Sequence, residues 1–491
     1  MATYDYDLGV IGGGAAGLTV TAGAAQLGAK VLLIEQEPLL GGDCLHFGCV
    51  PSKTLIKTAA VYHHLQQAER YGLPKISVPP VEFATVAARI RNVIQTIQPH
   101  DSPQRFCKLG ARVEFGHAAF SDEHTVRIYN KSFTAKQWLI ATGSTTAIPK
   151  IKNLEQTPYL TNREIFSLEK LPRSLIILGG GPIAIEMAQA FCRLGSRVEV
   201  IQRSNQILSK EDKDMADLLM ARLTEEGVTF HLNTTIKETG NNGSERSVTY
   251  TDSKGNEKTV HGEQLLVAMG RNANTKNMGL PAIDLAHSPG GIVVDRRLRT
   301  SHHHIYAAGD VTGNHQFTHA AGYEGGIVIS NAIFHLPRKT DYRLMPWCTY
   351  TEPELASIGM NEKAAQKAGI EYTAWVEDFA NNDRSLAEGE RMGKIKLILD
   401  KNEHPIGVQI LGLHGGDLIG EWVAALNGKI KLSTMASAIH PYPTLAEINK
   451  RVAGAVLSKK IFSAKVRKIL TFLFSLRGRA CEPEQQNKEN K

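Results

Sequence analysis

The sequence predicts an α/β fold with two parallel βαβ domains and a C-terminal α+β domain. A strand–turn–helix–strand pattern with a Gly-rich turn begins near the N-terminus and returns at residues 174–202. In both places two apolar strands flank a helix of small residues, which is the order of a parallel βαβ unit. From about Arg343 onward, strands and amphipathic helices follow without Gly-rich turns. With 491 residues, the chain is also too long for a single core.

The first βαβ unit contains the pattern Gly12-x-Gly14-x-x-Gly17. Gly12 permits a tight turn, Gly14 lets the backbone approach a pyrophosphate at the helix N-terminus, and Gly17 lets helix and strand pack closely. Glu35 ends the next strand, where a carboxylate accepts hydrogen bonds from a ribose diol. The strand, the helix, the spacing and the terminal acid together predict a Rossmann-like dinucleotide site.

Two cysteines follow this unit in the segment GGDCLHFGCVPSK, which begins at Gly41. Cys44 and Cys49 lie near the start of a predicted helix, whose positive end favours a thiolate. A disulfide between them would close a very short loop and so contribute little to stability. A redox-active disulfide explains the pair better than a structural one.

The second βαβ unit contains the pattern Gly179-x-Gly181-x-x-Ala184, with an alanine that the motif tolerates in its third position. Gln202 and Arg203 stand at the end of its second strand, in place of the acid that would favour NADH. Because Arg203 can pair with a 2′-phosphate, we expect NADPH as the reductant. The alternative is NADH, with Arg203 merely facing solvent.

The segment GGxCxxxGCxPSK between two dinucleotide patterns resembles the pyridine nucleotide–disulfide oxidoreductases, a family that includes dihydrolipoamide dehydrogenase, glutathione reductase and mercuric reductase. The resemblance covers roughly residues 5–455 and includes the motifs ATG, AAGD and YTEPELASIG. It implies a homodimer with FAD, in which NADPH reduces the flavin and the flavin reduces the disulfide. Electrons would then pass to a small-molecule acceptor.

The resemblance also divides the chain into domains. The expected segments are an FAD-binding domain at 1–149 and 272–342, an NAD(P)-binding domain at 150–271, an interface domain at 343–455, and a basic amphipathic tail with a disordered end at 456–491.

Roles for individual residues follow from the same resemblance. Cys49 is expected to be the thiolate beside the flavin, and Cys44 the thiol that exchanges with substrate. Lys53 matches the family's lysine near flavin N5 and Glu186 its ion-pair partner; a cation there favours hydride acceptance. Asp310 matches an acid that contacts the ribityl chain. The other expected cofactor contacts are Ala16, Gly42, Ala118, Ala141, Thr142, Gly143, Pro182, Ile183 and Gly270.

The segment AIHPYPTLAEI departs from the family pattern. Disulfide reductases of the family place a Glu five residues after a His; the His shuttles protons and the Glu orients it. Here Glu447 lies five residues after Tyr442, so Tyr442 takes the acid/base position. A tyrosine, with an ordinary pKa near 10, is a poor base at neutral pH. His440, two residues earlier, is the alternative base, unless it only packs.

A tyrosine at this place resembles mercuric reductase, but the C-terminal Cys-Cys pair that would hand on mercuric ion is missing from the sequence. We therefore expect an FAD-dependent NADPH:disulfide-type oxidoreductase with an unassigned acceptor. The alternatives are reduction of a metal ion (mercuric or cupric), a quinone or an oxidant, dihydrolipoamide dehydrogenase activity, and a redox sensor with negligible turnover. The three histidines at 302–304 have no second ligand cluster, so no metal site is expected.

Composition and charge limit the classes of partner that this chain is expected to bind. With 42% apolar and 21% charged residues, the chain resembles ordinary soluble globular proteins. Of its net charge of +7, most lies from Lys459 onward, where nine Lys or Arg face three Glu. The rest is nearly neutral, so no nucleic-acid partner is expected. The first predicted strand, Tyr6–Ile11, leaves no room for a signal peptide, which predicts a cytoplasmic protein.

The segment from Lys459 to Arg479 is basic and contains no acidic residue. Its apolar residues follow a helical period: Ile461, Phe462, Val466, Ile469, Leu470 and Leu473. Two interpretations remain open. The segment packs on the dimer surface, or it makes a weak peripheral contact with an anionic membrane.

Overall fold

The computed structural model describes residues 3–478 and 480–481, and the chain divides into two compact units, Met1–Ala356 and Ser357–Lys491. The disordered end that the sequence predicts lies, from residue 482 onward, outside the described residues. Among the described residues, no helix has both the length and the apolar character needed to cross a bilayer.

The first unit contains a seven-stranded sheet in the order β3-β2-β1-β6-β5-β4, and β18 also pairs with β6. Strands β1, β2, β3, β6 and β18 run parallel, while β4 and β5 extend the sheet antiparallel. Its strands are β1 (Tyr6–Ile11), β2 (Val31–Glu35), β3 (Ala111–Phe115), β4 (Ala119–Phe120), β5 (Thr125–Ile128), β6 (Lys131–Ile140) and β18 (Ile305–Ala307).

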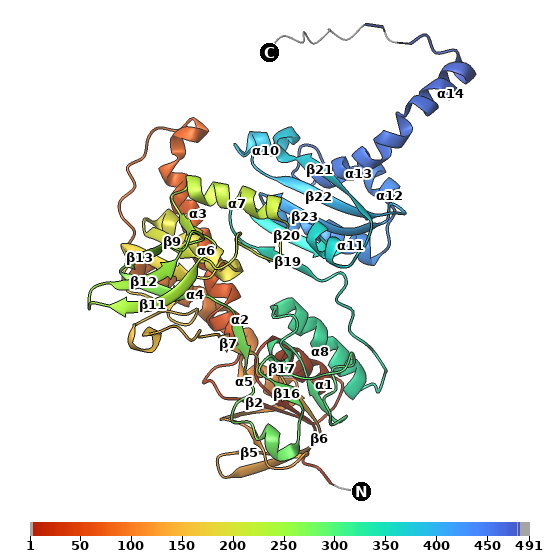
Figure 1. Ribbon diagram of the computed structural model, residues 1–491. Helices are drawn as coiled ribbons and strands as arrows, with labels where there is room; N and C mark the ends of the chain where they lie inside the picture. Colours follow the sequence, from red (N-terminus) through yellow and green to blue (C-terminus); the bar gives the residue numbers. More distant parts are fainter. Residues whose placement is uncertain (1–2, 479, 482–491) are drawn as a thin grey trace. The chain divides into compact units, whose positions relative to one another are not determined.

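Every residue of β2 is buried, as expected for a parallel strand that is covered on both faces. Helices α1 (Ala15–Gln26) and α8 (Thr318–Ala332) pack against each other beside this sheet (Figure 1). The predicted first strand, Tyr6–Ile11, is β1. The segment that carries the cysteine pair is helical: α2 (Gly42–His46), α3 (Cys49–Gln66) and α4 (Phe83–Ile97) follow one another, and α5 (Pro103–Lys108) precedes β3.

A second parallel sheet, in the order β10-β9-β8-β14, lies in the same unit. It is built from β8 (Ser174–Leu178), β9 (Arg197–Ile201), β10 (Thr229–His231) and β14 (Gln264–Val267), with helices α6 (Pro182–Leu194) and α7 (Lys213–Glu225). Three antiparallel strands accompany it: β11 (Thr235–Asn241), β12 (Arg246–Thr251) and β13 (Glu257–Gly262). The two predicted βαβ units are therefore present.

Short strands complete the first unit. The ladder of β7 (Ser144–Thr146) with β15 (Arg271–Ala273) joins the segments that leave and re-enter the first sheet. The other short strands are β16 (His287–Ser288), β17 (Gly291–Ile292) and β19 (Pro346–Thr349).

The second unit has the strand order β20-β23-β22-β21. The division between the units falls within β20 (Glu354–Gly359); the other strands are β21 (Tyr372–Asp378), β22 (Lys394–Asp400) and β23 (Pro405–Gly412). Its helices are α9 (Glu362–Lys367), α10 (Asp383–Ala387), α11 (Gly415–Asn427), α12 (Leu432–Ser437), α13 (Glu447–Ile461) and α14 (Ala464–Phe474). This is the α+β arrangement predicted for the C-terminal part.

Candidate active site

The turn between β1 and α1 forms an open cradle at a helix N-terminus. Gly12 has a φ of +110°, and a Cβ on Gly17 would lie 1.8 Å from the Gly12 carbonyl oxygen, so α1 starts directly against the strand. Gly14 is the N-cap of α1, and a Cβ there would meet no atom closer than 3.9 Å. Open space beside the free N–H groups of a helix start fits a pyrophosphate.

Glu35, at the end of β2, faces this turn. Its buried carboxylate accepts hydrogen bonds from the backbone N–H groups of Gly13 (2.6 Å) and Glu37 (2.8 Å). Burial raises the pKa of Glu35 above its usual value. An acceptor at this strand end suits a ribose diol, so the residues around the turn fit the adenosine part of FAD.

Asp310 follows β18 and lies close to the start of α1. A Cβ on the preceding Gly309 would be 3.6 Å from that of Ala16. The Asp310 carboxylate accepts a hydrogen bond of 2.5 Å from Ser144 Oγ and lies 3.7 Å from the Arg271 guanidinium. Burial raises the pKa of Asp310. A partly buried acceptor beside the dinucleotide turn fits the polyol chain of FAD.

The cysteine segment packs directly on the same turn. Gly41 N–H donates to the Gly13 carbonyl at 2.9 Å, and a Cβ on Gly42 would lie 2.8 Å from Gly14 Cα. Cys44 lies in the short helix α2, while Cys49 is the first residue of the 18-residue helix α3. The helix start predicted near the two cysteines is thus present, and the positive end of α3 lies at Cys49.

Cys44 and Cys49 are both free cysteines in the structure. The Cys44 thiol donates a hydrogen bond to the Cys49 sulfur; this bond lowers the pKa of Cys49 to about 6 and raises that of Cys44. The Thr318 hydroxyl, 3.3 Å from Cys49 Sγ, and the Lys53 cation lower the Cys49 pKa further, against the effect of burial. Near neutral pH, Cys49 is therefore the thiolate and Cys44 the thiol.

We expect iodoacetamide to alkylate Cys49 with a pH midpoint near 6 in the reduced protein, because only the thiolate reacts. Below the midpoint the thiol is protonated, and the rate should fall about tenfold per pH unit. Mass spectrometry of the labelled peptides measures the rate, with the exposed Cys107 as the internal control. Equal midpoints for Cys49 and Cys107 would contradict the thiolate assignment.

The ammonium group of Lys53 is a cation that lowers the pKa of the nearby Cys49 thiol. Its Nζ donates to Glu186 Oε2 on α6 at 2.8 Å and lies 4.3 Å from the centroid of the Tyr350 ring. Glu186 is buried, and its other oxygen accepts a hydrogen bond from Tyr350 N–H at 2.9 Å. Two elements far apart in the chain therefore orient the ammonium, as the resemblance implied for Lys53 and Glu186.

The second Gly-rich turn repeats the geometry of the first. Gly179 has a φ of +112°, and a Cβ on Gly181, the N-cap of α6, would meet no atom within 4 Å. Pro182 is the first residue of α6, and Ala184 is buried. This turn also fits a pyrophosphate.

Arg203 follows β9 beside this second turn. Its side chain is exposed and makes no hydrogen bond or ion pair with any residue from 3 to 478. A Cβ on Gly180 would lie 3.0 Å from the Gln202 side chain, so Gln202 packs on the turn. The guanidinium is thus available to an anionic group of a bound nucleotide.

The other residues expected at the cofactors differ in which of their groups are available for binding. Ala118 and Ala141 are buried, so only their backbone groups are available. Thr142 Oγ1 donates to the Asn274 carbonyl at 2.7 Å. Gly143 and Gly270 have a positive φ, which residues with a side chain rarely adopt. Ile183, on α6, is 39% exposed.

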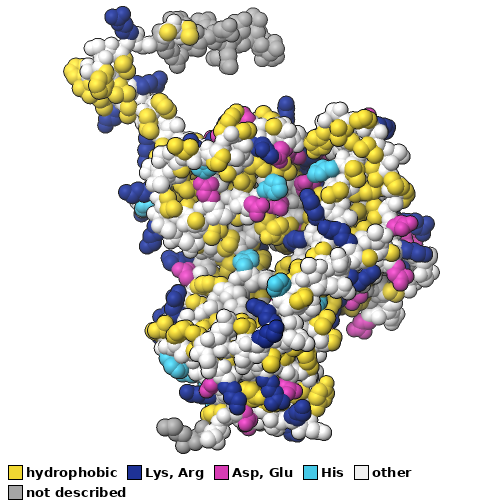
Figure 2. Space-filling model, turned by 180° about the vertical axis from the view of Figure 1, so that it is seen from behind, with side chains coloured by type: hydrophobic (Ala, Val, Ile, Leu, Met, Phe, Trp, Pro, Cys, Tyr) yellow, Lys and Arg dark blue, Asp and Glu magenta, His cyan; other side chains and the backbone are white. Residues whose placement is uncertain are grey.

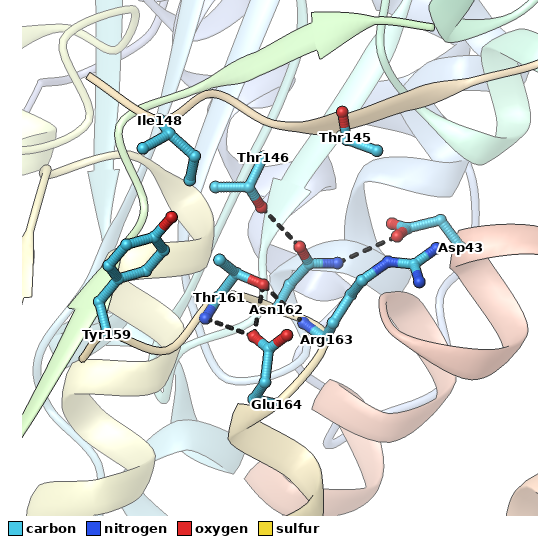
Figure 3. Close-up of a pocket in the computed structure, with 9 residues that line it drawn as sticks. All are labelled: Asp43, Thr145, Thr146, Ile148, Tyr159, Thr161, Asn162, Arg163 and Glu164. Atoms are coloured by element: carbon cyan, nitrogen blue, oxygen red, sulfur yellow. Dashed lines mark hydrogen bonds between the residues drawn. The ribbon is translucent and has the colours of Figure 1, made fainter. Parts of the chain in front are cut away.

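A pocket of about 270 Å³ lies beside α2 (Figure 3) and contains residues that sequence reasoning missed. The buried Asn162 donates to Asp43 Oδ1 and to the Phe47 carbonyl, both at 3.0 Å, and accepts from Thr146 Oγ1 at 2.7 Å. Arg271 pairs with the other Asp43 oxygen at 3.0 Å. These bonds hold both ends of the short helix that carries Cys44. No local pattern in the sequence marks Asn162, which lies 119 positions from Asp43.

In the second unit, His440 and Tyr442 have different surroundings. The His440 side chain is 11% exposed and lies 3.1 Å from Glu421 Oε1. Tyr442 is 70% exposed, and its hydroxyl donates to Asp383 Oδ2 at 2.8 Å, a bond that raises its pKa. Glu447, expected to orient the acid/base residue, begins α13. The two side chains do not share one orientation, because each has its own carboxylate partner.

Comparisons with known proteins show the family of this chain. The family described as pyridine nucleotide-disulphide oxidoreductase matches residues 6–325, and its dimerisation domain matches residues 345–453. Mercuric reductase of Staphylococcus aureus is 31% identical, over 95% of this chain and 84% of its own. Dihydrolipoyl dehydrogenase of Geobacillus stearothermophilus is 34% identical, and the match covers 92% of this chain and 96% of that protein.

Among solved structures, the HOCl-induced flavoprotein disulfide reductase RclA from Escherichia coli superimposes with a TM-score of 0.82 at 27% identity. The similarity covers 92% of this chain and 100% of that one. The Cu(II) complex of RclA superimposes with a TM-score of 0.82 at 26% identity, and the similarity covers 93% of this chain and 100% of that one.

Proposed function

Because the chain belongs to the pyridine nucleotide-disulphide oxidoreductase family, we propose that it uses NADPH to reduce a disulfide or another thiol-reactive acceptor through Cys44 and Cys49. Members of this family bind FAD and a nicotinamide nucleotide, and the dimerisation domain supports a homodimer. One observation carries the proposal: a thiol–thiolate pair packed on a dinucleotide turn, with a fixed cation beside it.

When bound, FAD supplies the transfer of two electrons from the nicotinamide to the disulfide. The residues around the first turn would hold its adenosine and polyol parts, and Lys53 would lie at its reacting side.

The proposed domain limits are those expected from the sequence, and the proposed location is the cytoplasm, where thiols stay reduced.

The chain's own groups support a complete exchange reaction. Cys44, after losing its proton, attacks one sulfur of an acceptor disulfide; the S–S bond breaks and the first thiol leaves with a proton. The Cys49 thiolate then attacks Cys44, forming the Cys44–Cys49 disulfide and releasing the second group as a thiolate, which takes a proton from solvent. Two electrons and a proton from NADPH return the pair to its starting state. The hydrogen bond between the sulfurs keeps one proton available for this sequence.

We propose Tyr442, rather than His440, as the acid/base residue, because its side chain is 70% exposed. His440 lies against Glu421, which suits a packing residue. With its raised pKa, Tyr442 would act as a proton donor and not as a base.

A second candidate function is the reduction of a soft metal ion. Two thiols on adjacent elements are suitable ligands for mercuric ion, and for the cuprous ion that forms when cupric ion is reduced. Relatives named mercuric reductase favour this candidate, as does a structural neighbour whose solved form is a Cu(II) complex. Quinones and oxidants complete the range of acceptors.

An anaerobic titration with NADPH tests the proposal. We expect the reduced enzyme to develop long-wavelength absorbance from the Cys49 thiolate against the flavin, and then to be reoxidised by its acceptor. Oxidised glutathione, lipoamide, mercuric and cupric ions and quinones form the panel. Reduction without this absorbance, and without turnover of any of them, would instead indicate a redox sensor.

A further inference from the structure

The last helix, α14, buries no side chain against the other described residues. None of the eleven residues of α14 (Ala464–Phe474) is buried. In Figure 1, α14 continues beyond α13 and away from the sheet of the second unit. Ser463 is the N-cap of this helix, and its hydroxyl accepts a hydrogen bond from the Val466 N–H.

Four aliphatic side chains of α14 share one face of the helix. Val466, Ile469, Leu470 and Leu473 stand at positions i, i+3, i+4 and i+7, which form one apolar stripe. Ile469, Leu470 and Leu473 are 46%, 37% and 62% exposed. So much exposed aliphatic surface on one helix indicates that something covers it.

Three basic residues of α14, Lys465, Arg467 and Lys468, lie outside this stripe, and the exposed Phe472 lies on their side of the helix. None of the three forms an ion pair within the described part of the chain. Figure 2 shows Lys and Arg side chains beside hydrophobic ones on this segment. By contrast, Lys460, on α13, pairs with Glu403, and Lys459 lies 5.4 Å from the centroid of the Trp375 ring. Unpaired cations beside an apolar stripe, without one acidic residue between 459 and 478, are complementary to an anionic surface with an apolar interior.

We propose that α14 binds the surface of an anionic lipid bilayer and lies in its plane. An eleven-residue helix is about 16 Å long, too short for a hydrocarbon core of about 30 Å, so it lies along the interface. The apolar stripe enters the boundary of the acyl chains and the basic residues face the head groups. A surface-bound reductase meets acceptors that dissolve in the membrane.

Flotation of the full-length protein with vesicles tests this. We expect binding to vesicles of equal parts phosphatidylcholine and phosphatidylglycerol, weaker binding to pure phosphatidylcholine, and release at high salt. A Lys465→Gln/Lys468→Gln variant should bind the anionic vesicles about 25-fold less tightly, since each basic residue near the surface accounts for about fivefold. Lys367→Gln/Lys401→Gln, on exposed lysines outside α14, is the matched control and should bind as the parent does.

A Leu470→Asp/Leu473→Asp variant tests the apolar stripe and should lose vesicle binding altogether. Because α14 buries no residue, its circular dichroism melting curve should stay unchanged. Equal binding by the parent and both α14 variants would overturn the proposal. So would a shift from dimer to monomer for Leu470→Asp/Leu473→Asp in analytical ultracentrifugation, since the stripe would then cover the second subunit.

Discussion

Replacing Cys49 by serine is expected to lower NADPH-dependent disulfide reduction by at least about 1,000-fold, because the variant loses the thiolate that closes the internal disulfide. Cys49 combines the first position of α3, the hydrogen bond from Cys44 and the nearby Lys53 cation. A serine hydroxyl stays protonated at that place. Steady-state turnover with a disulfide acceptor measures the effect.

Two further variants make the result specific. Cys44→Ser should also stop turnover but keep a thiolate at Cys49, so that its long-wavelength absorbance with bound flavin persists. Cys107→Ser removes an exposed thiol away from the pair and should leave turnover unchanged. If Cys49→Ser kept its activity with quinones or metal ions, electrons would be leaving the flavin directly, and the disulfide relay would be wrong for those acceptors.

Replacing Arg203 by glutamate is expected to lower kcat/KM for NADPH by about 100-fold while changing that for NADH little. A guanidinium–phosphate bond contributes about 1.5–3 kcal/mol, and the new carboxylate repels the 2′-phosphate as well. Since Arg203 makes no ion pair with any residue from 3 to 478, the change breaks no internal contact that would confuse the result. The ratio of the two kcat/KM values is the measurement.

Arg173→Glu is the matched control for this change. Arg173 is an 89% exposed arginine just before β8, and the change reverses the same charge away from the second turn. Unlike Arg203, Arg173 pairs with a carboxylate, that of Glu263 at 3.3 Å, so a melting curve of this variant checks that its fold is kept. We expect its NADPH-to-NADH ratio to equal that of the parent. If Arg203→Glu also left the ratio unchanged, Arg203 would merely face solvent and the preference for NADPH would lose its basis.

The site shows why some residues could be predicted and others could not. Gly12, Gly14 and Gly17 stand at fixed spacing in a turn whose backbone has few alternatives, so their geometry follows from local sequence. In the C-terminal acid/base segment, the sequence left two alternatives for His440, a base or a packing residue. The fold places His440 and Tyr442 against different carboxylates, those of Glu421 and Asp383.

Local sequence was enough to predict both Gly-rich turns, the helix that starts at Cys49 and the arginine after β9, because each depends on residues that are neighbours in the chain. Only folding brought Thr318 to Cys49 across 269 positions, Asn162 to Asp43 across 119, and the Tyr350 backbone to Glu186 across 164. Such contacts depend on how separate elements pack, and no periodicity or spacing records that packing.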